Sequence, residues 1–249
     1  MSARPSVLTT ETTQQRIDEY WANYLGCQVE DLHAAGTRTV FSERYPGIFG
    51  LMVGQARVYS IHPALQPFLA DPGFFFTPPG EFSPAAFPGL VARAGLHVQE
   101  TYGPGWLTYC DPASFRPRDD RSVCILDDTN AAEIGQLAEV VGWSELFREN
   151  SSQWIARFGL FQDRELASVA MLRAWGRQIG SLTVATRPEC RGRGCASQVV
   201  SRATRWLFEE TDLVPQYDTA LHNLASLRVA HGLGYRTYGQ IVYVRLVSD

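Results

Sequence analysis

The chain has 249 residues, 45% of them hydrophobic, and a formal net charge of −4; its 22 basic residues are all arginine. A chain of this length can bury a large core as one long domain or as two modest ones. The negative charge argues against nucleic acid as the main partner, because phosphate binding favours a basic surface.

No membrane partner is predicted, because no apolar run approaches the roughly 20 residues that span a bilayer. The first residues lack the apolar segment of a signal peptide, so we expect a cytoplasmic protein. The cysteines are odd in number and form no C-x-x-C pair. Neither a disulfide framework nor a metal site is therefore predicted.

The first half of the chain predicts helices and strands but contains no motif that carries chemistry. Apolar residues at helical spacing predict a helix over 13–25, and Pro84 favours the start of a helix over 84–94. Segments around glycine and proline turns predict strands at 40–41, 49–53, 55–61, 96–100 and 106–109, the last two separated by 102–105. Prolines and charges then interrupt the pattern between Asp111 and Asp120, where we expect a domain boundary.

In the second half, the patterns of strands and helices are easier to distinguish. Strands are predicted at 122–126, 154–161, 166–174, 181–186, 216–221 and 238–246. One helix begins near Asp127–Asn130 and has its apolar face up to Val141. Another follows Gly194, and a third covers 224–231 and ends at glycines.

The most informative segment runs from the strand at 181–186 through a glycine-rich turn into the helix that follows Gly194. Gly192 and Gly194 allow a tight turn, and the unpaired N–H groups and positive end of the helix favour an anion such as a diphosphate. Arg191 and Arg193 would add charge-assisted contacts. The alternative is an ordinary glycine-rich turn with two solvated arginines.

Local spacing separates the nucleotide-binding motifs that use such a unit. A P-loop needs Lys and Ser/Thr after its last glycine, where this chain has Cys195 and Ala196. A dinucleotide fingerprint needs glycine or alanine where Ser197 stands. Arg191, Gly194 and Ala196 match Arg/Gln-x-x-Gly-x-Gly/Ala, which resembles the coenzyme A signature of the GNAT acyltransferases. Asn223-Leu-Ala-Ser226, followed by Leu233-Gly234-Tyr235, also resembles that superfamily.

The resemblance implies a mixed α/β (α+β) fold with a mixed, largely antiparallel sheet over residues 117–249, preceded by an N-terminal α+β domain over 1–116. The N-terminal domain is either a degenerate GNAT-like half or a distinct domain that builds the acceptor pocket. The implied donor is acetyl-CoA, without a metal. Its contacts would come from Val184, Ala185, Thr186, Arg191, Gly192, Arg193, Gly194, Cys195, Ala196, Asn223 and Ser226.

Cys195 has two interpretations, because a helix N-terminus can lower the pKa of a thiol and make it a nucleophile. We favour a structural role for its side chain. Many family members have a catalytic tyrosine four residues after the Ser of the Asn-x-x-Ser motif, where this chain has Ala230. His231 is a candidate acid in its place, with solvent as the alternative.

The family pattern assigns no base either. Many members have a glutamate near the start of the strand that leads into the turn, where this chain has Gln178-Ile-Gly-Ser181 and no carboxylate. Asp218 is the candidate base or amine anchor, in a segment that resembles acetyltransferases of the zwittermicin-resistance type; a local structural role is the alternative.

We therefore predict an N-acetyltransferase that transfers an acyl group directly to a small-molecule or peptide amine. A non-catalytic, CoA-binding sensor and an O-acyltransferase are the alternatives. Members of the superfamily often pair through sheet edges, so a homodimer is a candidate assembly.

Overall fold

The computed structural model describes residues 10–69, 82–85, 87–143 and 153–247. Helices and strands are both substantial, which confirms the mixed α/β class. The chain divides into two compact units: unit 1 contains Thr108–Asp218, Ala225–Arg236 and the residues up to Thr13, and unit 2 contains Gln14–Leu107, Thr219–Leu224 and Thr237–Asp249. The domain boundary at 116/117 stays a prediction. Among the described residues, no helix is long and apolar enough to cross a membrane.

Unit 1 is built on a mixed sheet. Its strands follow the order β9, β8, β7, β6, β5, with bounds Val214–Ala220, Ile179–Thr186, Glu165–Trp175, Trp154–Gln162 and Val123–Ile125. Neighbours from β5 to β8 are antiparallel, whereas β8 and β9 are parallel. Helix α5 (Cys195–Glu210) makes the crossover that a parallel pair requires. The predicted mixed, largely antiparallel sheet is confirmed.

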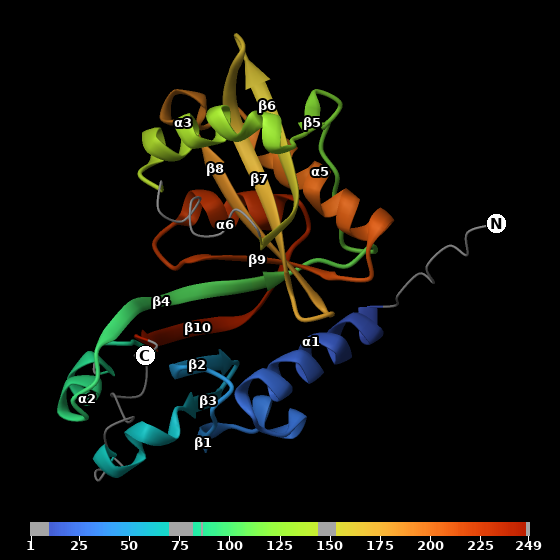
Figure 1. Ribbon diagram of the computed structural model, residues 1–249. Coiled ribbons are helices and arrows are strands. Elements are labelled where there is room, and N and C mark those ends of the chain that lie inside the picture. Colours follow the sequence, from blue (N-terminus) through green and yellow to red (C-terminus); the bar gives the residue numbers. More distant parts are fainter. Residues whose placement is uncertain (1–9, 70–81, 86, 144–152, 248–249) are drawn as a thin grey trace. The chain divides into compact units, whose positions relative to one another are not determined.

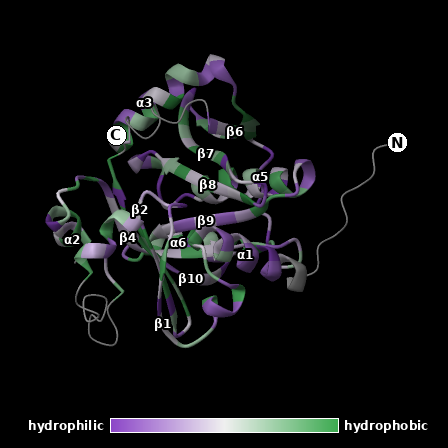
Figure 2. Cartoon of the chain, turned by 60° about the horizontal axis from the view of Figure 1, so that its bottom comes forward, coloured by the Kyte–Doolittle hydropathy of each residue, from purple (hydrophilic) through white to green (hydrophobic). Residues whose placement is uncertain are grey.

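Strand β7 separates the two cores of this unit, because its side chains alternate between the faces of the sheet. Ala170 and Leu172 pack with residues of α5, whereas Val169 and Met171 pack with residues of helix α3 (Ala131–Val141). The two helices accordingly lie on opposite faces of the sheet (Figure 1). Buried on both faces, β7 is largely hydrophobic in the colouring of Figure 2.

The start of α3 differs in detail from the predicted helix start. Asp127 accepts a hydrogen bond from the backbone of Thr129 and begins a 3-10 turn, η4 (Asp128–Asn130). The α-helix begins only at Ala131, and Asn130 makes no side-chain capping bond to it. The tighter turn satisfies the first N–H groups locally, so the helix starts after the predicted cap.

Helix α6 (Leu224–Gly232) ends as the glycines predicted. Gly234 has a φ of +92° and lies against the backbone of Ser114, so that a Cβ atom there would be 1.8 Å from the Ser114 carbonyl oxygen. Arg116 N–H donates to Leu233 O beside this crossing (2.9 Å). The glycine therefore lets the segment 113–116 pass directly over the turn after α6.

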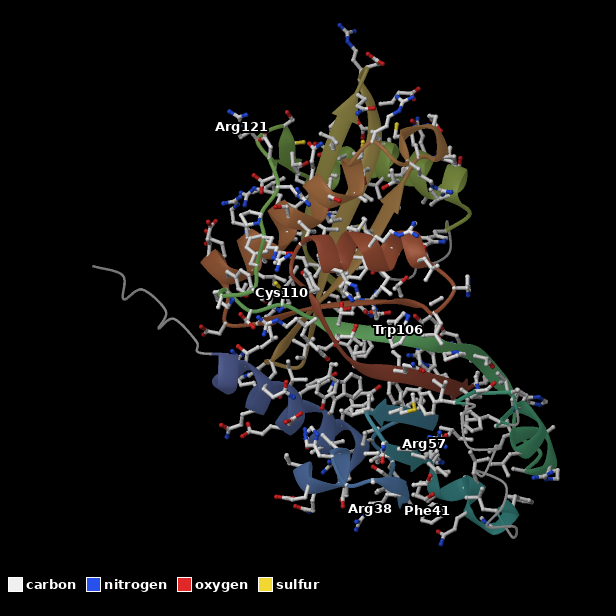
Figure 3. The ribbon with its side chains drawn as sticks, turned by 180° about the vertical axis from the view of Figure 1, so that it is seen from behind. Arg38, Phe41, Arg57, Trp106, Cys110 and Arg121 are labelled. Atoms are coloured by element: carbon white, nitrogen blue, oxygen red, sulfur yellow. The ribbon has the colours of Figure 1, made fainter. Side chains whose placement is uncertain are left out.

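Unit 2 has a sheet with the order β1, β3, β2, β10, β4, over Gly36–Phe41, Ala56–Ile61, Gly47–Val53, Arg236–Leu246 and Val98–Tyr109. Strand β1 pairs parallel to β3, and β2 pairs antiparallel to both β3 and β10. Arg38 and Phe41 lie on the edge strand β1 (Figure 3).

Two helical layers cover this sheet. On α1 (Thr10–Leu25), Trp21 contacts Phe49 at a ring distance of 5.5 Å, and Phe49 stacks on Tyr243. On the other face, side chains of η2 (Pro63–Phe68) and α2 (Phe87–Arg93) pack with Val242 and Val244. A further 3-10 turn, η1, covers Val29–Leu32.

The prediction of two strands at 96–100 and 106–109 is wrong, because β4 is a single strand through Tyr102-Gly-Pro-Gly105. A Cβ atom at Gly103 would lie 2.5 Å from Ile241 O on the neighbouring β10, so glycine permits this close approach. Pro104 O accepts from Leu221 N–H (3.1 Å). Residues that usually break a strand are accommodated here by contacts from distant parts of the chain.

Candidate functional site

The glycine-rich turn predicted as an anion site is exposed to solvent. Strand β8 ends at Thr186, a 3-10 turn η6 covers Pro188–Cys190, and α5 begins at Cys195. Residues 191–194 between them are all exposed. Gly192 and Gly194 have φ angles of +73° and +84°, and a Cβ atom on either would meet nothing within 4 Å. There is open space over the turn, enough for a ligand to approach the backbone.

The start of α5 has the properties of an anion site. No side chain caps the helix at Gly194, and its first turn contains no acidic residue. The N–H groups of a first helical turn have no partner inside the helix, and the positive end of the helix dipole lies there. Ala196 lies in this turn, where its small side chain leaves the backbone accessible.

The arginines of this segment have different roles. Arg187 is an anchor: its N–H donates to Ala167 O and its Nε to Leu166 O, both at 2.9 Å. Its largely buried side chain also lies near Glu165 (3.5 Å). Arg191 donates from Nε to Thr186 O (3.3 Å), and neither Arg191 nor Arg193 forms an ion pair with a described residue. These two exposed guanidinium groups are the ones available to an anion.

Strand β8 has an open edge beside the turn. It pairs with β7 along its whole length, from Ile179 to Thr186. Its parallel pairing with β9 stops at Leu182↔Tyr217. The last residues of β8 therefore have a strand neighbour on one side only, as an extended ligand would require to add to the sheet.

The hydrogen bonds of β8 show which residues face this edge. Gln178 O accepts from Val214 N–H (2.8 Å), whereas Ala185 O accepts from Ser168 Oγ on β7 (2.9 Å). Successive residues of a strand direct their backbone groups to alternate sides. Val184 and Thr186 therefore face the open edge, and the backbone of Ala185 faces β7.

Cys195 has a buried side chain, with a relative exposure of 1%. Burial raises the pKa of its thiol, an effect that outweighs the opposing one of nearby Arg193. A thiol held in its protonated form is a poor nucleophile. The structural role predicted for this side chain is the one its surroundings favour.

Asp218 follows Tyr217, the last residue of β9 in register with β8. It is half-buried and lies where the two strands stop pairing. The Tyr217 hydroxyl is hydrogen-bonded to Ser226 Oγ on α6 (2.8 Å). Burial, the largest effect, raises the pKa of Tyr217 to about 12. Sequence reasoning missed this tyrosine, whose contact with Ser226 depends on how α6 folds back on β9.

Asn223 lies directly before α6, is exposed, and donates from its N–H to Ala220 O (2.9 Å). It belongs to unit 2, whereas the glycine-rich turn at 191–194 belongs to unit 1. Ala230, at the position of the family's tyrosine, is fully buried in the core that contains Tyr235 and Leu233.

His231 is exposed near the end of α6. It lines a cavity of about 250 Å³ together with Ala113–Arg116 and Gly234–Arg236. No residue of β8 or of the glycine-rich turn lines this cavity, so His231 as the acid stays a prediction. No group of three or more His, Cys, Asp or Glu placed to hold a metal ion occurs in the described part of the chain.

Residues 157–242, from within β6 to within β10, match the family model described as GNAT acetyltransferase. This segment contains the glycine-rich turn, the open edge of β8, and helix α6. Over this segment the chain is similar to the GNAT acetyltransferases, a family of acyltransferases. The zwittermicin-resistance subgroup stays a prediction. Among curated proteins, no match was found.

Several solved structures are similar at low sequence identity. A protein described as a GNAT-family acetyltransferase from Novosphingobium aromaticivorans DSM 12444 shares 21% identity over 62% of this chain and 69% of its own, with a TM-score of 0.46. A GNAT-family acetyltransferase from Colwellia psychrerythraea shares 14% identity over 65% of this chain and 63% of its own, with a TM-score of 0.49. A GCN5-related N-acetyltransferase from Kribbella flavida shares 15% identity over 67% of this chain and 66% of its own, with a TM-score of 0.43. The matches thus span about two thirds of those chains.

Proposed function

We propose that the protein is an N-acetyltransferase that moves the acetyl group of acetyl-CoA to an amine by direct transfer. The observation that carries the proposal is the exposed turn at 191–194, which joins the open edge of β8 to the uncapped start of α5. Diphosphate and pantetheine are linked in acetyl-CoA. The helix start that suits a diphosphate and the strand edge that suits pantetheine are likewise adjacent in this chain.

Each part of the donor has a counterpart in this arrangement. The N–H groups from Gly192 to Ala196 would receive the diphosphate, with Arg191 and Arg193 adding charge-assisted hydrogen bonds. Val184 and Thr186 would pair with the pantetheine amides as a neighbouring strand does. Ser226 on α6 would add a side-chain contact to the same arm.

The chemistry then requires two proton movements. An amine that is protonated at neutral pH must lose a proton before its lone pair attacks the thioester carbonyl, and the departing thiolate must gain one. In this proposal Asp218 receives the amine proton, directly or through water, because it lies where β8 and β9 stop pairing. The thiolate takes its proton from solvent or from His231.

The donor site is tested by titrating acetyl-CoA into the unaltered protein and into Arg191→Ala and Arg193→Ala. We expect each variant to bind roughly tenfold more weakly, since each loses a charge-assisted hydrogen bond. Arg121→Ala is the matched control, because that arginine is also on unit 1, with a side chain 89% exposed and paired only with Asp119 among the described residues. Absence of acetyl-CoA binding by the unaltered protein would contradict the proposal.

The acceptor class is tested by thiol release from acetyl-CoA in the presence of a panel of small-molecule and peptide amines. Release that depends on an amine supports N-acetylation, whereas release only with hydroxyl acceptors indicates O-acetylation. Tight binding without release by any acceptor indicates a sensor. We also propose a cytoplasmic location, which cell fractionation would test.

We propose further that the N-terminal domain, residues 1–116, contributes to acceptor selection. The sheet of unit 2 combines strands of this domain with β10 and has a row of stacked rings, in which Tyr243 on β10 lies 5.1 Å from Tyr102 and 5.7 Å from Phe49. Beside it, Glu100 accepts from the Tyr243 hydroxyl (3.0 Å) and lies 3.7 Å from Arg245. Rings with a carboxylate suit an amine attached to an apolar group. A Glu100→Gln variant with unchanged acceptor preference would argue against this role.

A further inference from the structure

The hairpin between β6 and β7 reaches the glycine-rich turn through one side chain. Gln162 is the last residue of β6, and the turn after it contains Asp163 and Arg164, both with positive φ. Its Nε2 donates to Cys195 Sγ and its Oε1 accepts from Cys190 Sγ, each at 3.5 Å. One carboxamide is thus hydrogen-bonded to two thiols.

These cysteines mark the two ends of the exposed turn. Cys190 is the last residue of η6, and Cys195 is the first residue of α5. Both are buried, with relative exposures of 7% and 1%, in the core beneath the turn. A buried polar group is costly to leave without a hydrogen-bond partner, and the Gln162 carboxamide serves both thiols while its residue stays exposed at the surface.

The turn has few other restraints at its exit. Its entry is held by Arg187, which donates to two carbonyl groups of β7. At the exit, Gly194 provides no side chain and no other side chain caps α5. The exit is therefore positioned by the packing of α5, including Cys195, on the sheet and by the hydrogen bond from Gln162 to Cys195.

We propose that Gln162 is a positioning residue for the diphosphate of acetyl-CoA. By bonding to both thiols it fixes the separation between the two ends of the turn, and so directs the N–H groups of 192–196 toward one point. This inference rests on the proposed function. Gln162 acts on the nucleotide part of the donor and leaves the pantetheine strand edge unaffected.

The test uses Gln162→Met, which keeps the length of the side chain and removes its hydrogen bonds. Because about one net hydrogen bond at the turn exit is lost, we expect CoA to bind about fivefold more weakly. S-acetylpantetheine lacks the diphosphate, so kcat/KM for this donor should be unchanged. With acetyl-CoA, KM should rise and kcat should not fall. Gln99→Ala, an exposed glutamine on β4, is the control and should leave both donors unaffected.

A second pair of variants tests the same contact from the other side. Cys195→Ser keeps a hydrogen-bonding group and should retain more CoA affinity than Cys195→Ala, which should resemble Gln162→Met. Unchanged CoA affinity in both Gln162→Met and Cys195→Ala would overturn the inference. Equal losses with CoA and S-acetylpantetheine would also overturn it, since that result indicates a general structural role. If the unaltered protein binds no CoA, the proposed function itself fails. That result is distinct from the two outcomes that overturn the role of Gln162 alone.

Discussion

Gly234→Ala should destabilise unit 1 much more than Gly194→Ala, although both glycines have a positive φ. The φ angles are +92° and +84°, so the conformational cost of alanine is similar, about 1–2 kcal/mol at each position. The surroundings differ. A Cβ atom at Gly194 meets nothing within 4 Å, whereas at Gly234 it would lie 1.8 Å from Ser114 O and 2.7 Å from Ser114 C.

The contact at Gly234 is with backbone, which cannot rotate away as a flexible side chain can. The segment 113–116 must therefore move, which threatens the hydrogen bond from Arg116 N–H to Leu233 O (2.9 Å). Forced repacking of this kind costs about 1–3 kcal/mol, and the lost hydrogen bond adds about 1 kcal/mol. We expect a total of about 3–6 kcal/mol for Gly234→Ala, against about 1–2 kcal/mol for Gly194→Ala.

The measurement is urea denaturation of both variants and the unaltered protein, followed by tryptophan fluorescence, with the free energy of unfolding taken from linear extrapolation. Trp206 on α5 reports on unit 1, because it packs against the core of that unit. If the two variants lose the same free energy of unfolding, the close approach of Ser114 to the turn after α6 is not present in solution.

Three further outcomes are expected. Asp218→Asn should lower kcat by about 10²- to 10⁴-fold with little change in KM for acetyl-CoA, because it removes a proton acceptor and not a donor contact; an unchanged kcat would exclude Asp218 as the base. A thiol reagent should modify exposed Cys124 rapidly, and buried Cys110, Cys190 and Cys195 only on unfolding, so rapid modification of all cysteines in native protein would contradict the buried turn ends. Burial raises the pKa of Tyr24 and Tyr217 from 10.0 to about 12. Above pH 10 the native state therefore keeps protons that the unfolded chain releases. The contribution of these two residues to the free energy of unfolding should be complete below pH 10 and fall as pH rises toward 12. Tyrosinate absorbance that rises well before unfolding in alkaline titration would count against this burial.

Local pattern predicted the central unit of the protein well. The apolar spacing of Val199, Val200 and Ala203 predicted α5, and these side chains are fully buried against the sheet. Arg191, Gly192 and Gly194 predicted an exposed turn before that helix, which is where the residues lie. Both succeed for the same reason: helical periodicity and glycine turns depend on residues close in sequence.

Predictions that depended on a strand's neighbours were less successful. Gly103 and Pro104 looked like the end of a strand, yet β4 continues through them because β10 approaches closely at Ile241. The family resemblance named Val184, Ala185 and Thr186 together as donor contacts, without distinguishing the edge that each faces. Only the hydrogen bonds to β7 and β9 show that Ala185 faces the other way.

The sequence by itself thus determined most elements of the chain, the similarity of residues 157–242 to the GNAT acetyltransferases, and the position of the glycine-rich turn, because each depends on short-range spacing. Tertiary structure decided which strand edge is open, that β10 pairs with β2, and that Gln162 bonds to Cys190 and Cys195. These contacts join residues far apart along the chain. Strand register and side-chain packing select them, and neither is encoded in any local segment.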